Sequence, residues 1–516
     1  MPTIPKRPAR ATAVDELGRV QSLPAGPGDF RPLCGSGPKL VLLGLGPEPE
    51  ALPGLFPTCN TVHYLESPSL TEHLGPEWRA RIPATFREIA PSELPALARS
   101  GSKLLFYAPG QRLHPSFWSP LLARVQLAIL EQAPKPQPRL AWLPGGPSAL
   151  LRLELREALE TLGYQVRTST DAGGELDTAA QRSLLAGGEC PALLLSINFC
   201  GLDPLGEAYH LLRAAGAQVA VWCVDNPLHL LSGLKSPFWR AVPLFVTDAW
   251  FVEPLRRLGA CSVSHLPLAA RASALATPPL PGDPDLANSL LFVGRSAFPE
   301  KGGFFAGCRL PQDIWGQAQA MLALGERPDF GWWLPRLGIT QLWPGAAVRQ
   351  AGFGAEETGQ AWRTLCLTHA QAALGSQLTV YGDDGWNSLL PTGTDLRPPV
   401  DYYIALPGLV GSAACCLNLT SPLLPHGLTQ RHFDTWAWGG MLLSDATPGL
   451  DIFPAELTRE MTFRAPEHLA ERFRALTGQR SLRRDLCSAW RDLLRREHTY
   501  VHRLERLLET VGAGSC

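Results

Sequence analysis

The sequence predicts an α/β protein whose parallel sheets are doubly wound, with helices on both faces of each sheet. Apolar runs of four to seven residues recur along the chain between Gly or Pro residues, as in strands that are buried on both faces. The segments between these runs have apolar residues at helical spacing, as in crossover helices. With 516 residues, the chain is long enough for roughly two to four domains.

The first half of the chain contains seven strand-like runs. They are Lys39–Leu45, Thr61–Leu65, Lys103–Tyr107, Arg139–Leu143, Ala192–Ile197, Gln218–Val224 and Leu244–Thr247. Three helical segments each end before a glycine, the residue that most readily takes the left-handed conformation after a helix. These segments are Pro147–Leu162 before Gly163, Leu205–Ala215 before Gly216, and Trp250–Leu258 before Gly259.

A Pro-rich break at Ala276–Asp285 predicts a domain boundary, after which the pattern restarts. The second half has four strand-like runs and two helical segments. They are the runs Ser289–Val293, Gln377–Tyr381, Cys415–Leu419 and Met441–Ser444, and the helices Ala355–Gly375 and Gln430–Trp438. We expect Gly302–Gly354 to be an irregular insertion and Ser481–Thr510 to form one long amphipathic helix.

Composition excludes several classes of protein. Lys and Arg number 46 against 47 for Asp and Glu, so a net charge of -1 gives no general basic field for nucleic acid. Gly and Pro number 49 each, which is below the share at which disorder becomes the default. Ile404–Leu424 carries no formal charge, but Pro407, Asn418 and Pro422 interrupt it, so we expect a helix, a strand and a loop rather than a membrane span.

The twelve cysteines are scattered and form no C-x-x-C motif. Several lie in apolar runs, such as Cys200, Cys223 and Cys415. This pattern favours buried free thiols over a zinc site or disulfides, and so a reducing, cytoplasmic compartment. Met1–Val20 has no apolar core of a signal peptide, which agrees with that location.

The segment Leu419–Phe453 combines a strand end, a loop rich in Pro and Gly, a helix and the next strand. Thr429 is the expected N-cap of the helix, and Arg431 in its first turn offers two parallel donors to a phosphate. Asp434, one turn further on, could accept the hydroxyls of a ribose. A solvated Arg431–Asp434 pair is the simpler alternative for both residues.

Three other features of this segment allow two interpretations each. His426 in the loop either contacts a sugar hydroxyl or phosphate, or is an ordinary surface histidine. Gly440 either stops the helix together with Gly439 or lets a ligand approach closely. Asp445 either contacts a ligand at the strand's carboxyl end or belongs to a plain strand exit.

The loop Asp225-Asn226-Pro227 follows the run Gln218–Val224 directly, where α/β proteins bind ligands. Asp225 could deprotonate an acceptor hydroxyl, or simply hydrogen-bond it, with Asn226 and His229 beside it. An Asx-Pro turn with a structural role is the alternative. For Asp248, after Leu244–Thr247, we favour an N-cap.

Two other motifs are incomplete. Gly44-Leu45-Gly46 follows a strand but lacks the third glycine of a dinucleotide fingerprint, and we reject that interpretation. His498 and His502 lack the Glu of a metalloprotease motif, because Thr499 stands in its place. No D-x-D pair precedes a donor loop in a convincing context, so we expect neither a divalent metal nor another cofactor.

The chain from about Ala192 to its C-terminus resembles the CgeB-like glycosyltransferases of the spore maturation protein type. Besides Leu419–Phe453, the resemblance is carried by four short motifs. They are Trp222-Cys223-Val224-Asp225-Asn226-Pro227, Phe292-Val293-Gly294, Tyr381-Gly382 and His498-Thr499-Tyr500-x-x-Arg503. It implies the GT-B fold, in which two Rossmann-like domains face a cleft and the last helix commonly crosses back between them.

The sequence pattern and the resemblance together predict a domain arrangement, and the resemblance implies a function. From the pattern we expect residues 1–37 to be disordered or extended and 38–137 to form an α/β extension, which the resemblance does not cover. With the resemblance, 138–275 would be the acceptor-side domain, 286–480 the donor domain, and 481–516 the C-terminal helix, which could cross back. The enzyme would move a sugar from a nucleotide-diphosphate donor to a hydroxyl acceptor. It would need no nucleic acid and no transmembrane segment, and peripheral membrane contact stays open.

The resemblance assigns roles to particular residues. Asp225 and His426 would be catalytic, and Asn226 and His229 would face the acceptor. The donor would contact Gly294, Arg295, Arg431, Asp434, Gly440 and Asp445, with Lys301 as a second cation near the diphosphate. Related retaining enzymes carry a Glu-x7-Glu pair, whereas this chain has His426-x7-Asp434, so their mechanism and stereochemistry do not transfer directly.

Two alternative functions follow from the same features. A sugar-nucleotide epimerase or hydrolase would use the same two-domain cleft without an acceptor. A degenerate sugar-nucleotide-binding protein would explain the histidine at position 426. The donor sugar, the acceptor, the stereochemistry, the role of residues 1–137 and the oligomeric state do not follow from the sequence.

Overall fold

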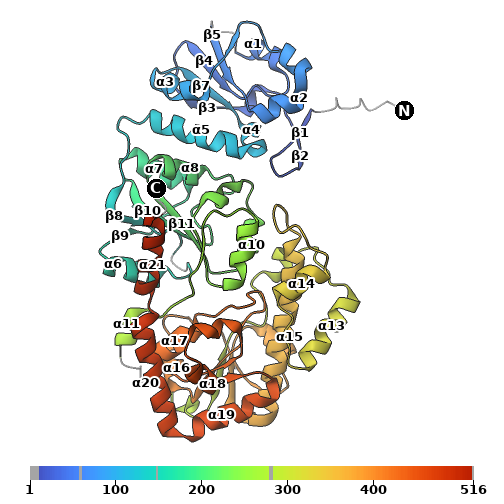
Figure 1. The fold of residues 1–516 in the computed structure, drawn as a ribbon, viewed down its shortest axis with the longest axis vertical. Helices are drawn as coiled ribbons and strands as arrows, with labels where there is room; N and C mark the ends of the chain where they lie inside the picture. The colour runs from blue at the N-terminus through green and yellow to red at the C-terminus, as the bar shows by residue number, and fades with distance from the viewer. Residues whose placement is uncertain (1–10, 57–60, 147–148, 278–282, 514–516) are drawn as a thin grey trace. The chain divides into compact units, whose positions relative to one another are not determined.

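The structure is a computed structural model that describes residues 11–56, 61–146, 149–277 and 283–513 (Figure 1). The chain divides into two compact units. Unit 1 comprises Met1–Leu150, Gln165–Val221 and Gly233–Val242, and unit 2 comprises Leu151–Tyr164, Trp222–Ser232 and Pro243–Cys516. The predicted break Ala276–Asp285 lies largely outside the described residues.

The first sheet of unit 1 has the strand order β3-β7-β4-β5-β6. Its strands are β3 (Phe30–Cys34), β4 (Lys39–Leu43), β5 (Thr61–Leu65), β6 (Phe86–Glu88) and β7 (Lys103–Tyr107). Four strands are parallel, with Leu40 opposite Val62 and Lys103, and only β3 runs antiparallel. A short hairpin of β1 (Thr12–Val14) and β2 (Val20–Ser22) precedes the sheet, in a region expected to be disordered or extended.

Helices cover both faces of this sheet because its central strands β4 and β7 are apolar from their second residue onward. Val41, Leu43 and Phe106 pack on one face with Trp118 of α5 (Pro115–Ala128) and with α3 (Leu94–Arg99). On the other face Leu40, Leu42 and Tyr107 pack with Trp78 of α2 (Pro68–Ala80) and with α1 (Leu52–Leu55). The run Lys39–Leu45 was therefore correctly predicted as a strand buried on both faces.

The second sheet of unit 1 contains parallel strands in the order β11-β10-β8-β9. They are β8 (Gln137–Trp142), β9 (Gln165–Arg167), β10 (Pro191–Ile197) and β11 (Gln218–Cys223), and the last two residues of β11 belong to unit 2. Helices α4 (Ala108–Leu113), α7 (Thr178–Ala186), α8 (Glu207–Ala214) and the short turn η4 (Pro237–Ala241) complete the unit.

Unit 2 contains a six-stranded parallel sheet in the order β16-β15-β14-β17-β18-β19. The strands are β14 (Leu290–Val293), β15 (Leu378–Tyr381), β16 (Asp395–Arg397), β17 (Cys415–Asn418), β18 (Leu442–Asp445) and β19 (Thr462–Phe463). The strand order reverses between β14 and β17, as in Rossmann-like sheets, where ligands bind beyond the carboxyl ends of the strands. The predicted α/β class with doubly wound, Rossmann-like sheets is confirmed.

The remaining elements of unit 2 include two strands and four helices from its earlier segments. They are α6 (Arg152–Thr161), α9 (Pro227–Leu231), β12 (Leu244–Val246), α10 (Val252–Arg257), β13 (Val263–His265) and α11 (Ala272–Ala276). The strands β12 and β13 pair in parallel, with Leu244 opposite Val263. The predicted glycine stops are confirmed, since Gly163, Gly216 and Gly259 have φ of +81°, +93° and +95°.

The expectation of an irregular insertion at Gly302–Gly354 is wrong. The segment forms α12 (Lys301–Phe304), α13 (Gln312–Ala323), α14 (Phe330–Arg336) and the start of α15 (Val348–Leu374). Trp315 and Trp333 stack at 6.4 Å between ring centroids, and α13 and α14 both pack on α15 (Figure 1). The helices are short and α14 contains Gly331 and Pro335, so their periodicity is too weak to recognise in the sequence.

The C-terminal segment is two helices rather than one. α20 (Arg480–Glu497) ends at His498, and α21 (Tyr500–Ala513) starts after Thr499. At the break, Ala270 N–H donates to the His498 carbonyl at 2.9 Å and Tyr500 N–H donates to the Ala270 carbonyl at 3.1 Å. These bonds to another segment replace helical ones, which the amphipathic pattern alone does not reveal.

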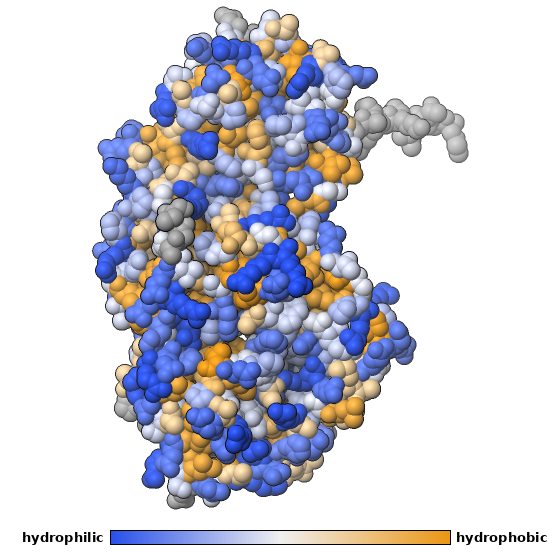
Figure 2. Space-filling model, in the orientation of Figure 1, coloured by the Kyte–Doolittle hydropathy of each residue, from blue (hydrophilic) through white to orange (hydrophobic). Residues whose placement is uncertain are grey.

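Four further helices belong to unit 2. They are α16 (Leu406–Ser412), α17 (Arg431–Ala437), α18 (Ala455–Met461) and α19 (Leu469–Gly478). Ile404–Leu424 contains a helix, a strand and a loop, as predicted. Across the described residues no helix is both long and apolar enough to span a membrane. On the face shown in Figure 2, hydrophilic and hydrophobic residues are interspersed.

The described cysteines are free. Cys223 and Cys415 are buried, as expected, but Cys200 is exposed. Cys200 is exposed because it lies in the turn after β10 and not in the strand itself, which ends at Ile197.

Candidate functional site

The loop between β17 and α17, residues 419–430, is held from three sides within unit 2. Asn226 Nδ2 donates to the Leu423 carbonyl at 3.0 Å. Asp248 Oδ2 accepts the His426 N–H at 2.9 Å. At the start of the loop, Thr420 N–H and Oγ1 both donate to Asp445 Oδ1 at 3.0 Å. The loop that carries His426 is therefore anchored at its beginning, middle and end by side chains from other strands' carboxyl ends.

A cavity of about 360 Å³ lies beside this loop, at the carboxyl ends of β17, β18 and β19. We call it the His426 cavity. Its lining residues include Arg327, Asp329, Thr420, His426, Pro448 and Arg464. Its position agrees with the rule that ligands of parallel sheets bind at the carboxyl ends of the strands.

Two carboxyl groups lie near His426. Asp329, which lines the cavity, caps α14 by accepting the Trp332 N–H at 2.9 Å, and burial raises its pKa. Asp248 is nearly fully buried, and loss of hydration raises its pKa to about 6. His426, Asp248 and Asp329 thus bring an imidazole and two carboxyl groups together beside the cavity, which are the residue types used for general acid–base chemistry.

Asp445 is buried and hydrogen-bonded to other side chains of the protein. Its side chain is 2% exposed, and Oδ2 accepts from Arg327 and, at 2.9 Å, from Trp362 Nε1. Arg327 also donates to Thr420 Oγ1 at 2.6 Å. Asp445 therefore joins the ends of β17 and β18 to the segment before α14, and presents Arg327 to the His426 cavity.

The N-terminus of α17 differs from the prediction. Gln430, in the helical conformation, occupies the N-cap, and the Thr429 hydroxyl donates instead to Asn418 Oδ1 at 2.9 Å. The Thr429 N–H donates to His432 Nδ1 at 3.0 Å. The predicted Thr429 cap is wrong because the hydroxyl ties the loop to β17.

Asp434 lies on the buried side of α17, with 3% of its surface exposed. Oδ2 accepts from the Tyr402 hydroxyl at 2.7 Å and Oδ1 from Gln430 Nε2 at 2.9 Å. Gln430 Nε2 also donates to the Ala269 carbonyl, and its Oε1 accepts from the Tyr500 hydroxyl at 2.6 Å. Burial raises the pKa of Asp434 to about 7, although both hydrogen bonds favour the carboxylate.

Arg431 does not pair with Asp434. Its side chain is half-buried near Tyr402 and Cys416, where burial lowers the pKa of the guanidinium, and its Nε has no hydrogen-bond partner among the described residues. The solvated ion pair considered from the sequence is therefore absent at this helix.

The loop after β14 carries Gly294, Arg295 and Ser296. Ser296 is fixed, because its N–H and hydroxyl donate to Asp383 at 2.9 and 2.5 Å, and its carbonyl accepts from Arg363 at 3.1 Å. The Gly294 carbonyl accepts from Trp386 Nε1 at 2.8 Å. Arg295 between them is exposed. A rigid loop thus presents one cation at the carboxyl end of β14.

The candidates after β11 fall into different environments. Asp225 is exposed at the carboxyl end of the strand. Asn226 caps α9 through Leu228 N–H at 3.0 Å and supports the loop of His426. His229 is buried among Phe304, Phe305 and Phe330, with ring centroids 5.4 to 5.9 Å away. Burial lowers the pKa of His229 to about 4, so its ring is a neutral group within an aromatic cluster.

Gly440 lies before β18, at the amino end of the strand and so at the opposite edge of the sheet from the His426 cavity. A Cβ at this position would meet Val410 Cγ1 at 2.5 Å. Close packing therefore requires a glycine here, and the structure does not bring Gly440 together with the other candidates.

Lys301, the second cation considered for the diphosphate, pairs with other side chains of the protein. Its Nζ lies 2.5 Å from Glu357 Oε1 and donates to Gln360 Oε1 at 3.2 Å.

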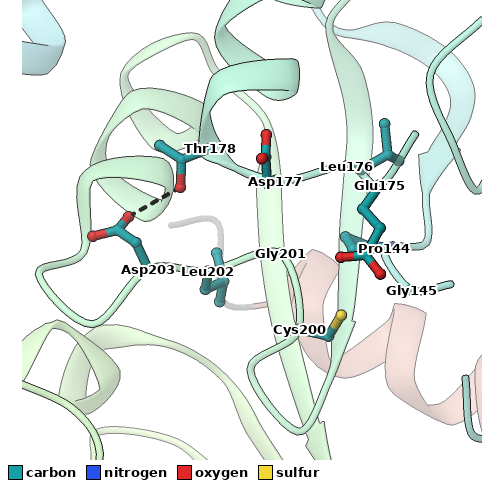
Figure 3. Close-up of a pocket in the computed structure, with 10 residues that line it drawn as sticks. All are labelled: Pro144, Gly145, Glu175, Leu176, Asp177, Thr178, Cys200, Gly201, Leu202 and Asp203. Carbon is teal, nitrogen blue, oxygen red and sulfur yellow. Dashed lines mark hydrogen bonds between the residues drawn. The ribbon is translucent and has the colours of Figure 1, made fainter. Parts of the chain in front are cut away.

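Unit 1 has its own cavity, of about 210 Å³, beyond the carboxyl ends of β8 and β10 (Figure 3). In the view of Figure 3, Glu175 and Cys200 lie on one side and Thr178 and Asp203 on the other. Asp177 caps α7 through Ala180 N–H at 2.8 Å, and Asp203 accepts from Ala208 N–H at 2.8 Å. These two carboxylates hold the wall of the cavity together.

Three residues of the His426 cavity were not predicted from the sequence. Arg327, Asp329 and Arg464 come from segments that were expected to be irregular or carried no motif. A signal exists only for Asp329, which precedes a short aromatic helix as an N-cap does. Among the described residues no group of three or more His, Cys, Asp or Glu side chains is arranged to hold a metal ion.

Residues 363–509 match a family model described as glycosyl transferase-like. This match confirms the prediction of a glycosyltransferase-type domain for that segment, which contains β15 to β19 and α17. No curated protein matches the sequence.

Several solved structures are similar at low sequence identity. T4 phage BGT in complex with UDP and Mn2+ is 10% identical, with a TM-score of 0.41, over 72% of this chain and 99% of that chain. An alpha-glucosyltransferase in complex with UDP-glucose and DNA containing an abasic site is 12% identical, with a TM-score of 0.43, over 72% and 98%. A Thermobaculum terrenum O-GlcNAc transferase mutant is 11% identical, with a TM-score of 0.34, over 96% and 71%.

Proposed function

We propose that this chain is a glycosyltransferase of the GT-B type that transfers a sugar from a nucleotide-diphosphate donor to a hydroxyl acceptor. The observation that carries the proposal is the His426 cavity. It lies beyond β17 and β18 of a Rossmann-like sheet, and most of its lining residues belong to the segment matched by the glycosyl transferase-like family model. It combines His426 and Arg464 of that segment with Arg327 and Asp329, which precede it.

In this proposal the donor extends along the carboxyl ends of β14, β17 and β18. Arg295, on the fixed loop after β14, neutralises the diphosphate, and the sugar lies in the His426 cavity. His426 contacts the sugar, where its backbone is fixed by Asp248 and its ring has Asp329 nearby. A ribose contact of Asp434 stays a prediction, since it requires Tyr402 or Gln430 to release a carboxylate oxygen.

The acceptor hydroxyl needs a group that takes its proton as the new glycosidic bond forms. Asp225, exposed at the carboxyl end of β11, is the proposed base. Most of the rate enhancement would come from positioning two substrates and from stabilising the leaving diphosphate by Arg295. Asn226 acts indirectly, by holding the loop of His426, and is a positioning residue.

Three finer points belong to the same proposal. The motifs quoted above favour the CgeB-like subtype, although His426 departs from the Glu of related enzymes. The reaction proceeds without a divalent metal, with the cations Arg295 and Arg327 beside the donor. The free thiols of the described cysteines favour a reducing, cytoplasmic location.

A second candidate is a sugar-nucleotide-binding protein without turnover, which the histidine at position 426 favours. A nucleotide-release assay separates the candidates, using a panel of sugar nucleotides with and without a mixed panel of hydroxyl acceptors. We expect release that depends on the acceptor. Release without any acceptor indicates a hydrolase, no detectable conversion of a sugar nucleotide that binds indicates the binding protein, and conversion of the sugar without release indicates an epimerase.

A further inference from the structure

The first sheet of unit 1 has the topology of a nucleotide-binding fold, although residues 38–137 have no role in the proposed function. Its parallel strands lie in the order β7-β4-β5-β6, so the first strand of the set, β4, lies between the second and the fourth. Doubly wound sheets bind ligands at this point, where the strand order reverses.

The loop after β4 is Gly44-Leu45-Gly46, the motif that lacks the third glycine of a dinucleotide fingerprint. Gly44 and Gly46 have φ of +81° and +71°. A Cβ on Gly44 would approach Tyr107 Cβ at 2.9 Å, and a Cβ on Gly46 would approach the Tyr107 ring at 3.1 Å. Glu66, at the end of β5, fixes the loop by accepting the Leu45 N–H at 2.8 Å. The loop keeps the tight turn of a nucleotide-binding loop, but Tyr107 covers part of it.

A cavity of about 180 Å³ lies beside this loop, at the carboxyl ends of β4 and β7. Phe30, Leu52, Leu55 and Tyr107 supply apolar walls, and the Phe30 and Tyr107 ring centroids are 5.4 Å apart. This volume is smaller than the roughly 300–1,000 Å³ of pockets that enclose whole drug-sized ligands, but aromatic walls suit one stacked base.

The residues that line the cavity favour a ligand without a phosphate. The lining residues include no Lys, Arg or His, and the one charged member, Glu48, is exposed at the rim. The nearby cation Arg81 is paired with Glu50 at 2.6 Å. Among the lining residues a phosphate would therefore meet the Glu48 carboxylate and no cation, whereas that carboxylate can accept hydrogen bonds from ribose hydroxyls.

We infer that this cavity binds a nucleoside without phosphate groups, with the base between the apolar walls and the ribose at Glu48. The site is separate from the His426 cavity and does not depend on the proposed transfer reaction. It gives the N-terminal part of unit 1 a ligand-binding role.

Isothermal titration of the full chain with adenosine, guanosine, uridine and cytidine tests the inference. We expect at least one nucleoside to bind, and its 5′-monophosphate to bind at least tenfold more weakly. Leu55→Trp fills the cavity and should abolish this binding, whereas Leu153→Trp makes the same change at a half-exposed leucine of α6 and should not. Glu48→Gln should weaken binding roughly tenfold, through loss of a charge-assisted hydrogen bond, with Glu131→Gln as control.

Further variants guard against misfolding and against binding at the donor site. If Leu55→Trp lowers the Tm, Ala51→Phe fills the mouth of the cavity from an exposed position. The inference fails if no nucleoside binds, if binding persists in the cavity-filling variants, or if the monophosphate binds equally well. It also fails if His426→Ala abolishes nucleoside binding while Leu55→Trp leaves it intact, whereas loss of glycosyl transfer alone concerns the proposed function.

Discussion

His426 and Asp434 are the two ends of the His426-x7-Asp434 motif, but one lines a cavity and the other is buried. His426 lines an open cavity together with Arg327 and Asp329, and only its backbone N–H is bonded to a side chain, that of Asp248. Asp434 is buried, and both of its oxygens accept hydrogen bonds within the protein. The comparison teaches that two residues of one motif can differ in exposure, one lining a cavity and the other belonging to a buried hydrogen-bond network.

The difference arises from the local structure around each residue. His426 belongs to a loop whose backbone is held by Asn226 and Asp248, so its side chain needs no packing partner of its own. Asp434 follows the start of α17 by one turn and faces Tyr402 and Gln430. We therefore expect changes at His426 to affect catalysis and changes at Asp434 to affect stability.

The largest effect on activity is expected for His426→Ala. Loss of a group that acts on the sugar or on a proton should lower kcat/KM about 10²- to 10⁴-fold, with little change in the free energy of unfolding. His369→Ala, at an exposed position of α15, is the matched control. An activity within a factor of three of the unchanged protein would remove His426 from the site.

The largest effect on stability is expected for Asp445→Asn. The variant leaves Arg327 without its buried carboxylate partner, which should lower the free energy of unfolding by about 2–4 kcal/mol. Urea denaturation measures the change, with Asp451→Asn at an exposed position as the control. A change below about 0.5 kcal/mol would mean that the network around Asp445 adds little.

The pH dependence of stability tests the buried environment of Asp434. Its folded-state pKa of about 7 exceeds the unfolded value, so the folded state binds the extra proton and the chain loses stability as pH rises from about 4 to 7. Asp434→Asn should remove this loss, and the variant should gain on the order of 1–3 kcal/mol relative to the unchanged chain between pH 5 and pH 8.

Denaturation curves at several pH values measure the free energy of unfolding of both proteins. Titration of the Asp434→Asn variant with a sugar-nucleotide donor then measures its donor affinity. We expect donor affinity to change less than tenfold. An unaltered stability profile combined with a larger loss of donor affinity would instead restore the ribose contact that the sequence suggested for Asp434.

A smaller effect is expected for Arg295→Ala. An exposed arginine beside a diphosphate should contribute about 1.4 kcal/mol or somewhat more, so donor affinity should fall roughly tenfold. Arg459→Ala removes an exposed arginine from α18 of the same unit and should leave affinity unchanged. An equal loss of donor affinity in the two variants would show that the affinity depends on the net charge of the protein and not on the position of Arg295.

The smallest effect at neutral pH is expected for His229→Leu. The imidazole is neutral and surrounded by aromatic rings, so an apolar side chain should change stability by less than about 1 kcal/mol and leave acceptor kinetics unchanged. The folded pKa of about 4 is below the unfolded value, so the unchanged chain loses stability as pH falls below about 6.5. Thermal unfolding at pH 5 should therefore favour the variant, and a raised KM for acceptor would contradict this account.

Much of the fold could be predicted from the sequence because buried parallel strands are continuous apolar runs. Thr61–Leu65 and Lys103–Tyr107 match β5 and β7 residue for residue. Short edge strands such as β13 and β16 were missed, since three polar or mixed residues carry no period. The helices at 301–354 were missed because glycine and proline interrupt them.

The site was less predictable, because its walls come from segments far apart in the chain. The loop of His426 followed from strand and helix positions, but its bonds to Asn226 and Asp248 are tertiary contacts that no spacing reveals. Asp445 and His229 have side-chain chemistry that suits a ligand, yet both are buried and contact other side chains of the protein. Residue type predicted the available chemistry, whereas burial decided which groups can reach a substrate.

The most direct test of the central claim is isothermal titration with a panel of nucleotide-diphosphate sugars, on the unchanged chain and on Arg295→Ala, His426→Ala and Arg459→Ala. The account predicts saturable binding of at least one donor, weakened in the first two variants and unchanged in the third. Absence of binding to every donor, or equal binding by all four proteins, would contradict it.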